Sequence, residues 1–132
     1  MKKYVLDSYA LFVYLEGESS AKKVASIISS ALQDKAKVYM SVINWGEVYY
    51  IVLREQGKEA AELYIKTIDR YPIEIIDADK EITLEAGKIK SYHKLSYVDA
   101  FAGALAKIKK AHLVTGDKEF KTLEKLIKID WL

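Results

Sequence analysis

The sequence SYVDAFAGALAKIKKAHLVT, residues 96–115, carries the strongest structural signal in the chain. Apolar side chains cover nearly the whole circumference of a helix drawn over residues 96–110, and charge returns only with the lysines of its last turn. A helix that is apolar on all sides is buried in the protein. Residues 112–115 then form a short apolar run that predicts a strand. We therefore expect a buried helix that leads directly into a strand, with Asp99 in the first turn of the helix.

The rest of the chain alternates short β-branched or aromatic runs with longer helical patterns. Strands are predicted at residues 4–6, 38–41, 73–76, 112–115 and 127–129. Helices are predicted at residues 9–15, from Ser19 or Ser20 to about Leu32, and at 44–56, 58–70, 80–92, 96–110 and 118–125. Strands separated by helical crossovers indicate a parallel sheet between layers of helices. Because the chain has one proline, six glycines and no linker-like stretch, we expect residues 1–132 to form a single α/β domain.

The composition excludes several classes of protein. The formal net charge is only +2, so the chain lacks the basic excess of a protein that binds polyanions over its whole surface. No cysteine and only two histidines are present, which excludes disulfides, a cysteine nucleophile and multi-histidine zinc sites. No apolar run reaches the roughly 18 residues of a membrane span, and the first residues do not resemble a signal peptide. We therefore expect a cytoplasmic protein without a membrane partner.

Four acidic residues stand where a parallel sheet would place a ligand site. Asp7 directly follows the first strand, and Asp117 follows the strand at 112–115 after Thr115 and Gly116. Glu47 lies in the helix after the second strand, and Asp99 opens the buried helix. In open parallel sheets, ligands bind beyond the carboxyl ends of the strands.

Each of these acids also has an ordinary structural explanation. Asp7, Asp99 and Asp117 could cap the helices that follow them, and Glu47 could be a solvated helix residue. Capping does not exclude ligation, because a carboxylate in a first helical turn can still project outward.

The four acids together point to a cation. Two unit charges 5 Å apart repel by about 3 kcal/mol at an effective dielectric near 20. Carboxylates that converge in a partly buried cleft therefore either take up protons or hold a cation. A site with oxygen ligands only favours Mg²⁺ or Mn²⁺, and such sites characteristically bind phosphate esters. Asp77 and Asp79 are not expected in this group. Glu119, two residues after Asp117, could be an auxiliary ligand, but it is interpreted mainly as a first-turn helix residue that the helix dipole favours.

Four segments that carry these acids occur in a recognisable order. They read VLDS at 5–8, SVINWGEV at 41–48, SYVDA at 96–100 and LVTGDKEF at 113–120. With these motifs the chain resembles the PIN-domain ribonucleases over essentially its whole length, and most closely the VapC toxins of type II toxin–antitoxin systems.

The resemblance implies a three-layer α/β/α fold with about five parallel strands in the order 3-2-1-4-5. It also implies an endoribonuclease that depends on Mg²⁺ or Mn²⁺, forms a homodimer and is inhibited by a cognate antitoxin protein. Asp7, Glu47, Asp99 and Asp117 match the acidic residues that hold the metal and act in catalysis in that family. Thr115 matches a hydroxyl position beside the last acid that could orient water or phosphate, although it could equally be an ordinary threonine at the end of a strand.

Several alternatives stay open at this point. The chain could be a PIN-like RNA-processing nuclease without a toxin role, or a PIN-like protein-binding module without catalysis. A phosphoacceptor receiver domain fits less well, because it needs paired acids after the first strand, where this chain has Asp7 and Ser8. A haloacid-type phosphatase also fits less well, because Tyr9 stands where its motif requires a second aspartate. Lysines near the acids could contact phosphates or be solvated. Four tyrosines of the third and fourth helices could form an interface or pack in the core: Tyr49, Tyr50, Tyr64 and Tyr71.

Overall fold

The computed structural model describes residues 1–132, and its centre is a parallel sheet of five strands. The strands are β1 (Lys2–Leu6), β2 (Ala36–Ser41), β3 (Ile73–Ile76), β4 (His112–Thr115) and β5 (Ile129–Trp131). Their order in the sheet is β3-β2-β1-β4-β5, and every neighbouring pair is parallel. The predicted fold class and strand order are therefore confirmed.

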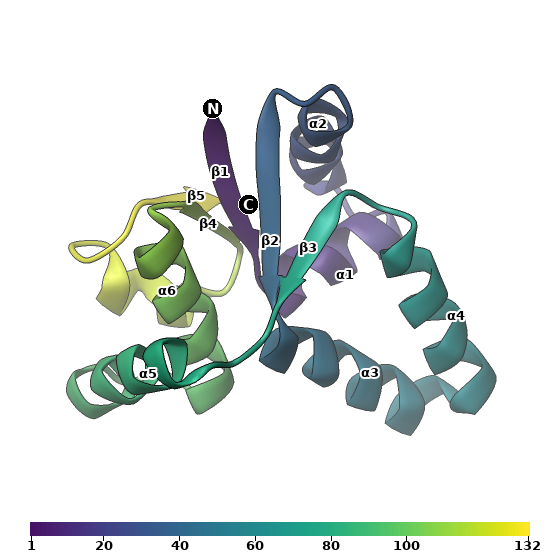
Figure 1. Ribbon diagram of the computed structural model, residues 1–132. Coiled ribbons are helices and arrows are strands. Elements are labelled where there is room, and N and C mark those ends of the chain that lie inside the picture. Colours follow the sequence, from purple (N-terminus) through teal and green to yellow (C-terminus); the bar gives the residue numbers. More distant parts are fainter.

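Helices cover both faces of the sheet (Figure 1). They are α1 (Ser8–Glu16), α2 (Ala21–Leu32), α3 (Val42–Gln56), α4 (Lys58–Asp69), α5 (Lys80–Tyr92) and α6 (Tyr97–Lys109), with a 3-10 helix η1 at Lys118–Leu123. Side chains alternate between the faces along each strand. Val5 and Leu113 accordingly pack against α5, α6 and η1, whereas Leu6 and Val114 pack against α1 to α4. Two hydrophobic cores result, one on each side of the sheet.

Helix α6 is buried as its sequence predicts, except in its first turn. Every residue from Ala100 to Ala106 is buried, but Tyr97 is 47% exposed. Gly103 lets α6 approach η1 closely, because a Cβ at this position would lie 2.7 Å from Leu123 Cδ1. The buried part of the helix thus begins directly after Asp99, which leaves that carboxylate near the surface.

The last strand begins two residues later than predicted. Ile127 does not join the sheet; its N–H donates to the Leu123 carbonyl at 3.0 Å, which continues the turn after η1. The Lys128 carbonyl then accepts from Leu113 N–H at 2.9 Å and starts the pairing with β4. The apolar signal of Ile127 therefore reports burial in the core beside α6, and the predicted strand at 127–129 is wrong by this shift.

The four tyrosines, of which Tyr71 lies just beyond the end of α4, divide between the two interpretations. Tyr49, Tyr64 and Tyr71 pack against the core on the α1–α4 side, whereas Tyr50 is 48% exposed. None of the helices combines the length and apolar character that a membrane crossing requires.

Candidate active site

The carboxyl ends of β1 and β4 lie next to each other and present two of the predicted acids. Leu6 pairs with Val114 across the two strands, so Asp7, directly after β1, lies beside Thr115, the last residue of β4. Asp117 follows two residues later, at the start of η1.

Asp7 is both a helix cap and a buried acid. It is 2% exposed. Its Oδ1 accepts from the Ala10 N–H at 2.8 Å, and its Oδ2 accepts from the Thr115 hydroxyl at 2.5 Å. Burial raises the pKa of Asp7 from its ordinary 3.8 to about 7, although these two hydrogen bonds act in the opposite direction. The nearby charges of Asp99 and Asp117 raise the pKa further, which places all three carboxylates within electrostatic reach.

Thr115 ties Asp7 to Asp117. Its side chain is fully buried, and its hydroxyl donates to Asp7 while it accepts from the Asp117 backbone N–H at 3.0 Å. The hydroxyl proton is therefore already used within the protein. This geometry suits a residue that positions the two acids better than one that contacts a substrate.

Asp99, Asp117 and Glu119 form the most compact group of acids. One carboxylate oxygen from each of the three lies within 4.8 Å of the other two. The pKa of Asp99 is raised to about 7, mainly by burial and then by the charge of Asp117, with smaller contributions from Glu47 and Glu119. A hydrogen bond with Ser96 acts in the opposite direction.

Glu119 is the residue that the sequence interpretation underrated. Its backbone N–H donates to Asp117 Oδ1 at 2.9 Å, as expected for the first turn of a helix. The same turn brings its carboxylate beside Asp99 and Asp117. Its position two residues after Asp117 was the available signal, but the residue after next in a helical turn does not ordinarily share a face with the first.

Glu47 reaches the site from α3 and is held by Ser8. The Ser8 hydroxyl donates a short hydrogen bond to Glu47 Oε1 and lies 3.3 Å from the Asn44 carbonyl oxygen. Asn44, which is fully buried, directs its Nδ2 toward the same hydroxyl at 3.4 Å. Ser8 was expected to pack or cap, so its contact with Glu47 is a further feature that only the folded chain reveals.

Of the four predicted acids, the structure places Asp99 and Asp117 in one compact group, which Glu119 completes. Asp7 and Glu47 lie outside that group, but the charges of Asp99 and Asp117 raise the pKa of Asp7, and the charge of Glu47 raises that of Asp99. The two acids that were set aside stay outside this group. Asp79 caps α5 by accepting from the Ile82 N–H at 2.9 Å, and Asp77 follows β3 at the edge of the sheet.

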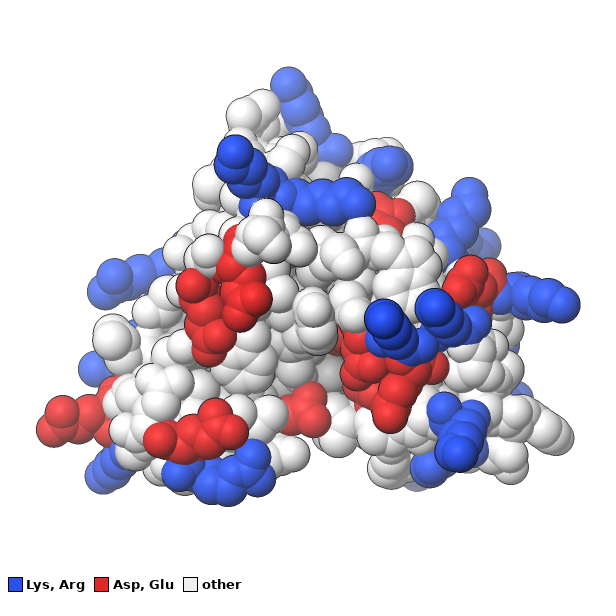
Figure 2. Space-filling view, turned by 180° about the vertical axis from the view of Figure 1, so that it is seen from behind, with Lys and Arg blue, Asp and Glu red and all other residues white.

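Acidic side chains also form a compact patch in the space-filling view from behind, on the side of the molecule that carries α5 and α6 (Figure 2). Lysine or arginine side chains border this patch.

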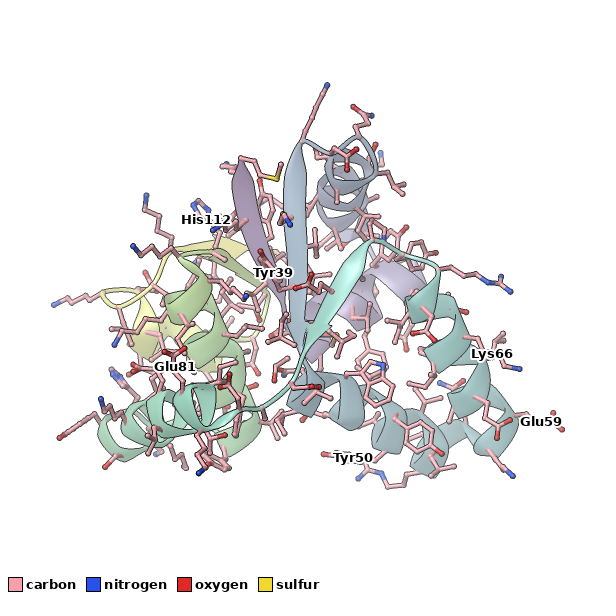
Figure 3. All side chains as sticks on the ribbon, in the orientation of Figure 1. Tyr39, Tyr50, Glu59, Lys66, Glu81 and His112 are labelled. Carbon is pink, nitrogen blue, oxygen red and sulfur yellow. The ribbon has the colours of Figure 1, made fainter.

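No basic side chain neutralises the acids from within the protein. The ion pairs of the molecule join other residues: Arg54–Glu55, Lys58–Glu62, Lys107–Glu85 and His112–Asp130. His112 lies at the start of β4, at the opposite end of that strand from Thr115 (Figure 3). A group of carboxylates without a cationic partner has the donor set that a hard divalent ion such as Mg²⁺ or Mn²⁺ prefers.

The comparisons with known proteins agree with this architecture. The chain is similar to VapBC2 from Rickettsia felis, solved with a DNA fragment from its promoter, at 19% identity and a TM-score of 0.76 over 97% of both chains. It is similar to DNA-bound VapBC from Salmonella typhimurium at 17% identity and 0.74 over 98% of both chains. It is also similar to VapC20 from Mycobacterium tuberculosis, described as a toxin that cleaves the sarcin–ricin loop, at 18% identity and 0.70 over 89% of this chain and 92% of that one.

At these identities the solved structures establish a shared fold. Among curated proteins, none matches the chain by sequence. The sequence model of the PIN domain, however, matches residues 4–126, which is nearly the whole chain. The chain therefore belongs to the PIN domain family.

Proposed function

We propose that this protein is an endoribonuclease that depends on Mg²⁺ or Mn²⁺. The observation that carries the proposal is the convergence of carboxylates without a basic partner at the carboxyl ends of β1 and β4. Asp99 and Asp117 would hold the ion, with Glu119 close enough to join them. Asp7 and Glu47, whose charges interact with this group, would assist. Membership of the PIN domain family supports nuclease chemistry for this site.

The protein's own residues prepare the site for phosphodiester hydrolysis. When bound, the ion would lower the pKa of a water molecule and stabilise the charge that develops on the phosphoryl oxygens. Thr115 fixes the separation of Asp7 and Asp117, and Ser8 orients Glu47. An in-line attack by water would leave a 5′-phosphate and a 3′-hydroxyl end.

Cleavage of RNA in the presence of Mg²⁺, Mn²⁺ or EDTA tests the proposal. We expect EDTA to abolish cleavage and Asp7→Asn to reduce it by about a hundredfold or more. Asp77→Asn is the matched control, because Asp77 also follows a strand but lies at the sheet edge, outside the acidic group. Undiminished cleavage by Asp7→Asn, or equal losses in both variants, would remove the proposal.

We further propose that the protein is the toxin of a VapBC-type pair and that a cognate antitoxin protein binds it. We also propose that it forms a homodimer in the cytoplasm. Solved relatives support this, among them a toxin–antitoxin complex from Klebsiella pneumoniae. An apolar cavity of about 360 Å³ lies between α3 and α4, lined by Trp45, Tyr49 and Ile65 among others. An antitoxin segment with apolar side chains would fit this surface.

An RNA-processing nuclease without a toxin role would share the same chemistry. Growth arrest on expression, relieved by a small protein encoded next to this one, favours the toxin. Unaffected growth despite active enzyme favours the processing role.

A further inference from the structure

The aromatic ring of Tyr9 lies directly on the backbone of Gly116, at the rim of the acidic site. A Cβ built on Gly116 would lie 2.6 Å from Tyr9 Cζ and 2.9 Å from its Oη, so a larger residue here would displace the ring from this position. Gly116 stands between Thr115 and Asp117 in the chain. The Cα atoms of Thr115 and Asp117 are each about 3.8 Å from that of Gly116. The ring that contacts Gly116 therefore lies close to both residues.

The ring is also open to solvent. Tyr9 is 46% exposed, in the first turn of α1 and two residues after Asp7. Neither the hydrogen bonds nor the aromatic pairs within the protein include this side chain. A large, half-exposed aromatic side chain thus lies next to the residue that joins Thr115 to Asp117, and no hydrogen bond or aromatic pair of the protein occupies it.

A second half-exposed tyrosine near the acids, Tyr97, is arranged differently. Its ring packs edge-on against Phe101, with the ring centres 4.9 Å apart. It stands two residues before Asp99 on α6, and successive helical residues are about 100° apart, so the two side chains project to nearly opposite sides of the helix. Of the two rings, Tyr9 is therefore the one placed beside the acids.

We propose that Tyr9 is the platform on which a nucleobase next to the cleaved phosphate stacks. Stacking on aromatic side chains is how proteins hold splayed-out bases of single-stranded RNA, and it tolerates any sequence because every base has a flat face. Bases inside a duplex are covered by their neighbours and cannot occupy the platform. This inference rests on the proposed nuclease function and assigns Tyr9 a role in positioning its substrate.

Kinetics of cleavage on an unpaired RNA oligonucleotide test the role of the ring. Stacking holds substrate and transition state alike, so Tyr9→Ala should raise KM by about tenfold with kcat nearly unchanged. Tyr9→Phe and Tyr9→Trp, which keep an aromatic face, should stay within about threefold of the wild type. Tyr50→Ala is the matched control, because Tyr50 is equally exposed but lies on α3 beside Arg54 (Figure 3).

A substrate that lacks one base provides the complementary measurement. For the wild type, an RNA with an abasic residue at the stacking position should have a KM raised by the same factor as Tyr9→Ala produces with the intact RNA. Tyr9→Ala should raise the KM of the abasic RNA no further. A duplex substrate should be cleaved at least about tenfold more slowly than the single strand. Additive losses from the variant and the abasic residue, or equal cleavage of single strand and duplex, would overturn the inference.

Fluorescence detects the stacking directly and without relying on activity. We expect an RNA with 2-aminopurine at this position to be quenched on binding Asp7→Asn, and the quenching to disappear in Asp7→Asn/Tyr9→Ala. Quenching that persists without the ring contradicts the role of Tyr9. If wild-type protein with Mn²⁺ cleaves RNA while Tyr9→Ala behaves like the wild type, only this inference fails; if the wild type cleaves no RNA at all, the proposed function fails first.

Discussion

Asp7 combines two roles that the sequence could only offer as alternatives. One carboxylate oxygen caps α1 and the other accepts from the Thr115 hydroxyl, so each oxygen has a hydrogen-bond donor within the protein. The hydrogen bonds fix the direction of the side chain, and burial makes its negative charge costly. An acid in this condition favours either a proton or a nearby cation, which is the physical basis of the proposed metal site.

The stability of the metal-free protein should therefore fall as the pH rises. The pKa values of Asp7 and Asp99 are raised from 3.8 to about 7, so the folded protein binds these protons more tightly than the unfolded chain. The stabilisation is complete below about pH 4 and is lost as the pH rises through about 7. Asp7 accounts for at most about 3 kcal/mol of the loss between pH 5 and 8.

Urea unfolding in EDTA at pH 5 and pH 8 measures this difference. Asp7→Asn keeps the shape of the side chain but cannot titrate, so its free energy of unfolding should change less between the two pH values. The same pH dependence in both proteins would mean that Asp7 carries no raised pKa.

Ser8 gives a second prediction at the scale of one side chain. Ser8→Ala removes the hydroxyl that holds Glu47, so cleavage should slow by about tenfold or more while the fold is preserved. Ser8→Thr keeps the hydroxyl and should restore most of the rate. Steady-state kinetics measure the cleavage rates, and thermal melts check that the variants are folded. A Ser8→Ala variant as active as the wild type would show that Glu47 does not need the Ser8 hydroxyl.

At the scale of elements, the sequence predicts best where periodicity and burial coincide. The strand at 73–76 and the strand at 112–115 were placed correctly because each is a short apolar run bounded by turns. The strand after η1 was misplaced because Ile127 is buried by packing in the hydrophobic core and does not pair with a strand of the sheet. Apolar character reports burial, and it does not reveal which neighbour provides it.

The candidate site divides in the same way. Asp7 and Asp117 could be proposed because residues directly after parallel strands must meet at one edge. Glu119 and the link from Ser8 to Glu47 depend on the angle at which η1 and α3 leave the sheet. Tertiary packing sets these angles, so they could not be predicted from the sequence of one chain.

The contact between α1 and the turn after β4 predicts the effect of a single methyl group. In Gly116→Ala the new Cβ would overlap the Tyr9 ring, so the ring or the turn that carries Asp117 must move. Because the contacted atoms belong to the far end of a half-exposed side chain, which can turn aside, we expect a loss of at most about 1 kcal/mol in the free energy of unfolding. Gly87→Ala is the matched control, because a Cβ there meets nothing within 4 Å and alanine favours the helix α5.

A double variant isolates the cause. With Tyr9→Ala already present, the space over Gly116 is free, so Gly116→Ala should cost much less than it does alone. An equal cost in both backgrounds would place the strain elsewhere in the turn.

For the whole molecule, the strand order decides which distant residues meet. Strands β1 and β4 lie side by side although more than a hundred residues separate them, and the acids of α3 and α6 approach the same edge from opposite faces of the sheet. Only the folded chain has this group of charges. An ion that binds the group therefore stabilises the folded state and scarcely the unfolded one.

Thermal melts with Mn²⁺ should consequently show a higher Tm than melts with EDTA. At an ion concentration about 100 times the Kd, mass action adds about 2.7 kcal/mol to the free energy of unfolding, on the order of 10 °C for a domain of this size. The shift should be larger at pH 8 than at pH 5, because Asp7 and Asp99 hold protons at the lower pH and must release them to bind the ion. Asp7→Asn should show a smaller shift, Asp77→Asn the full one, and NaCl at equal ionic strength none. A Tm that millimolar Mn²⁺ leaves unchanged at pH 8 would mean that the carboxylates tolerate one another without an ion, and the metal-dependent mechanism would lose its foundation.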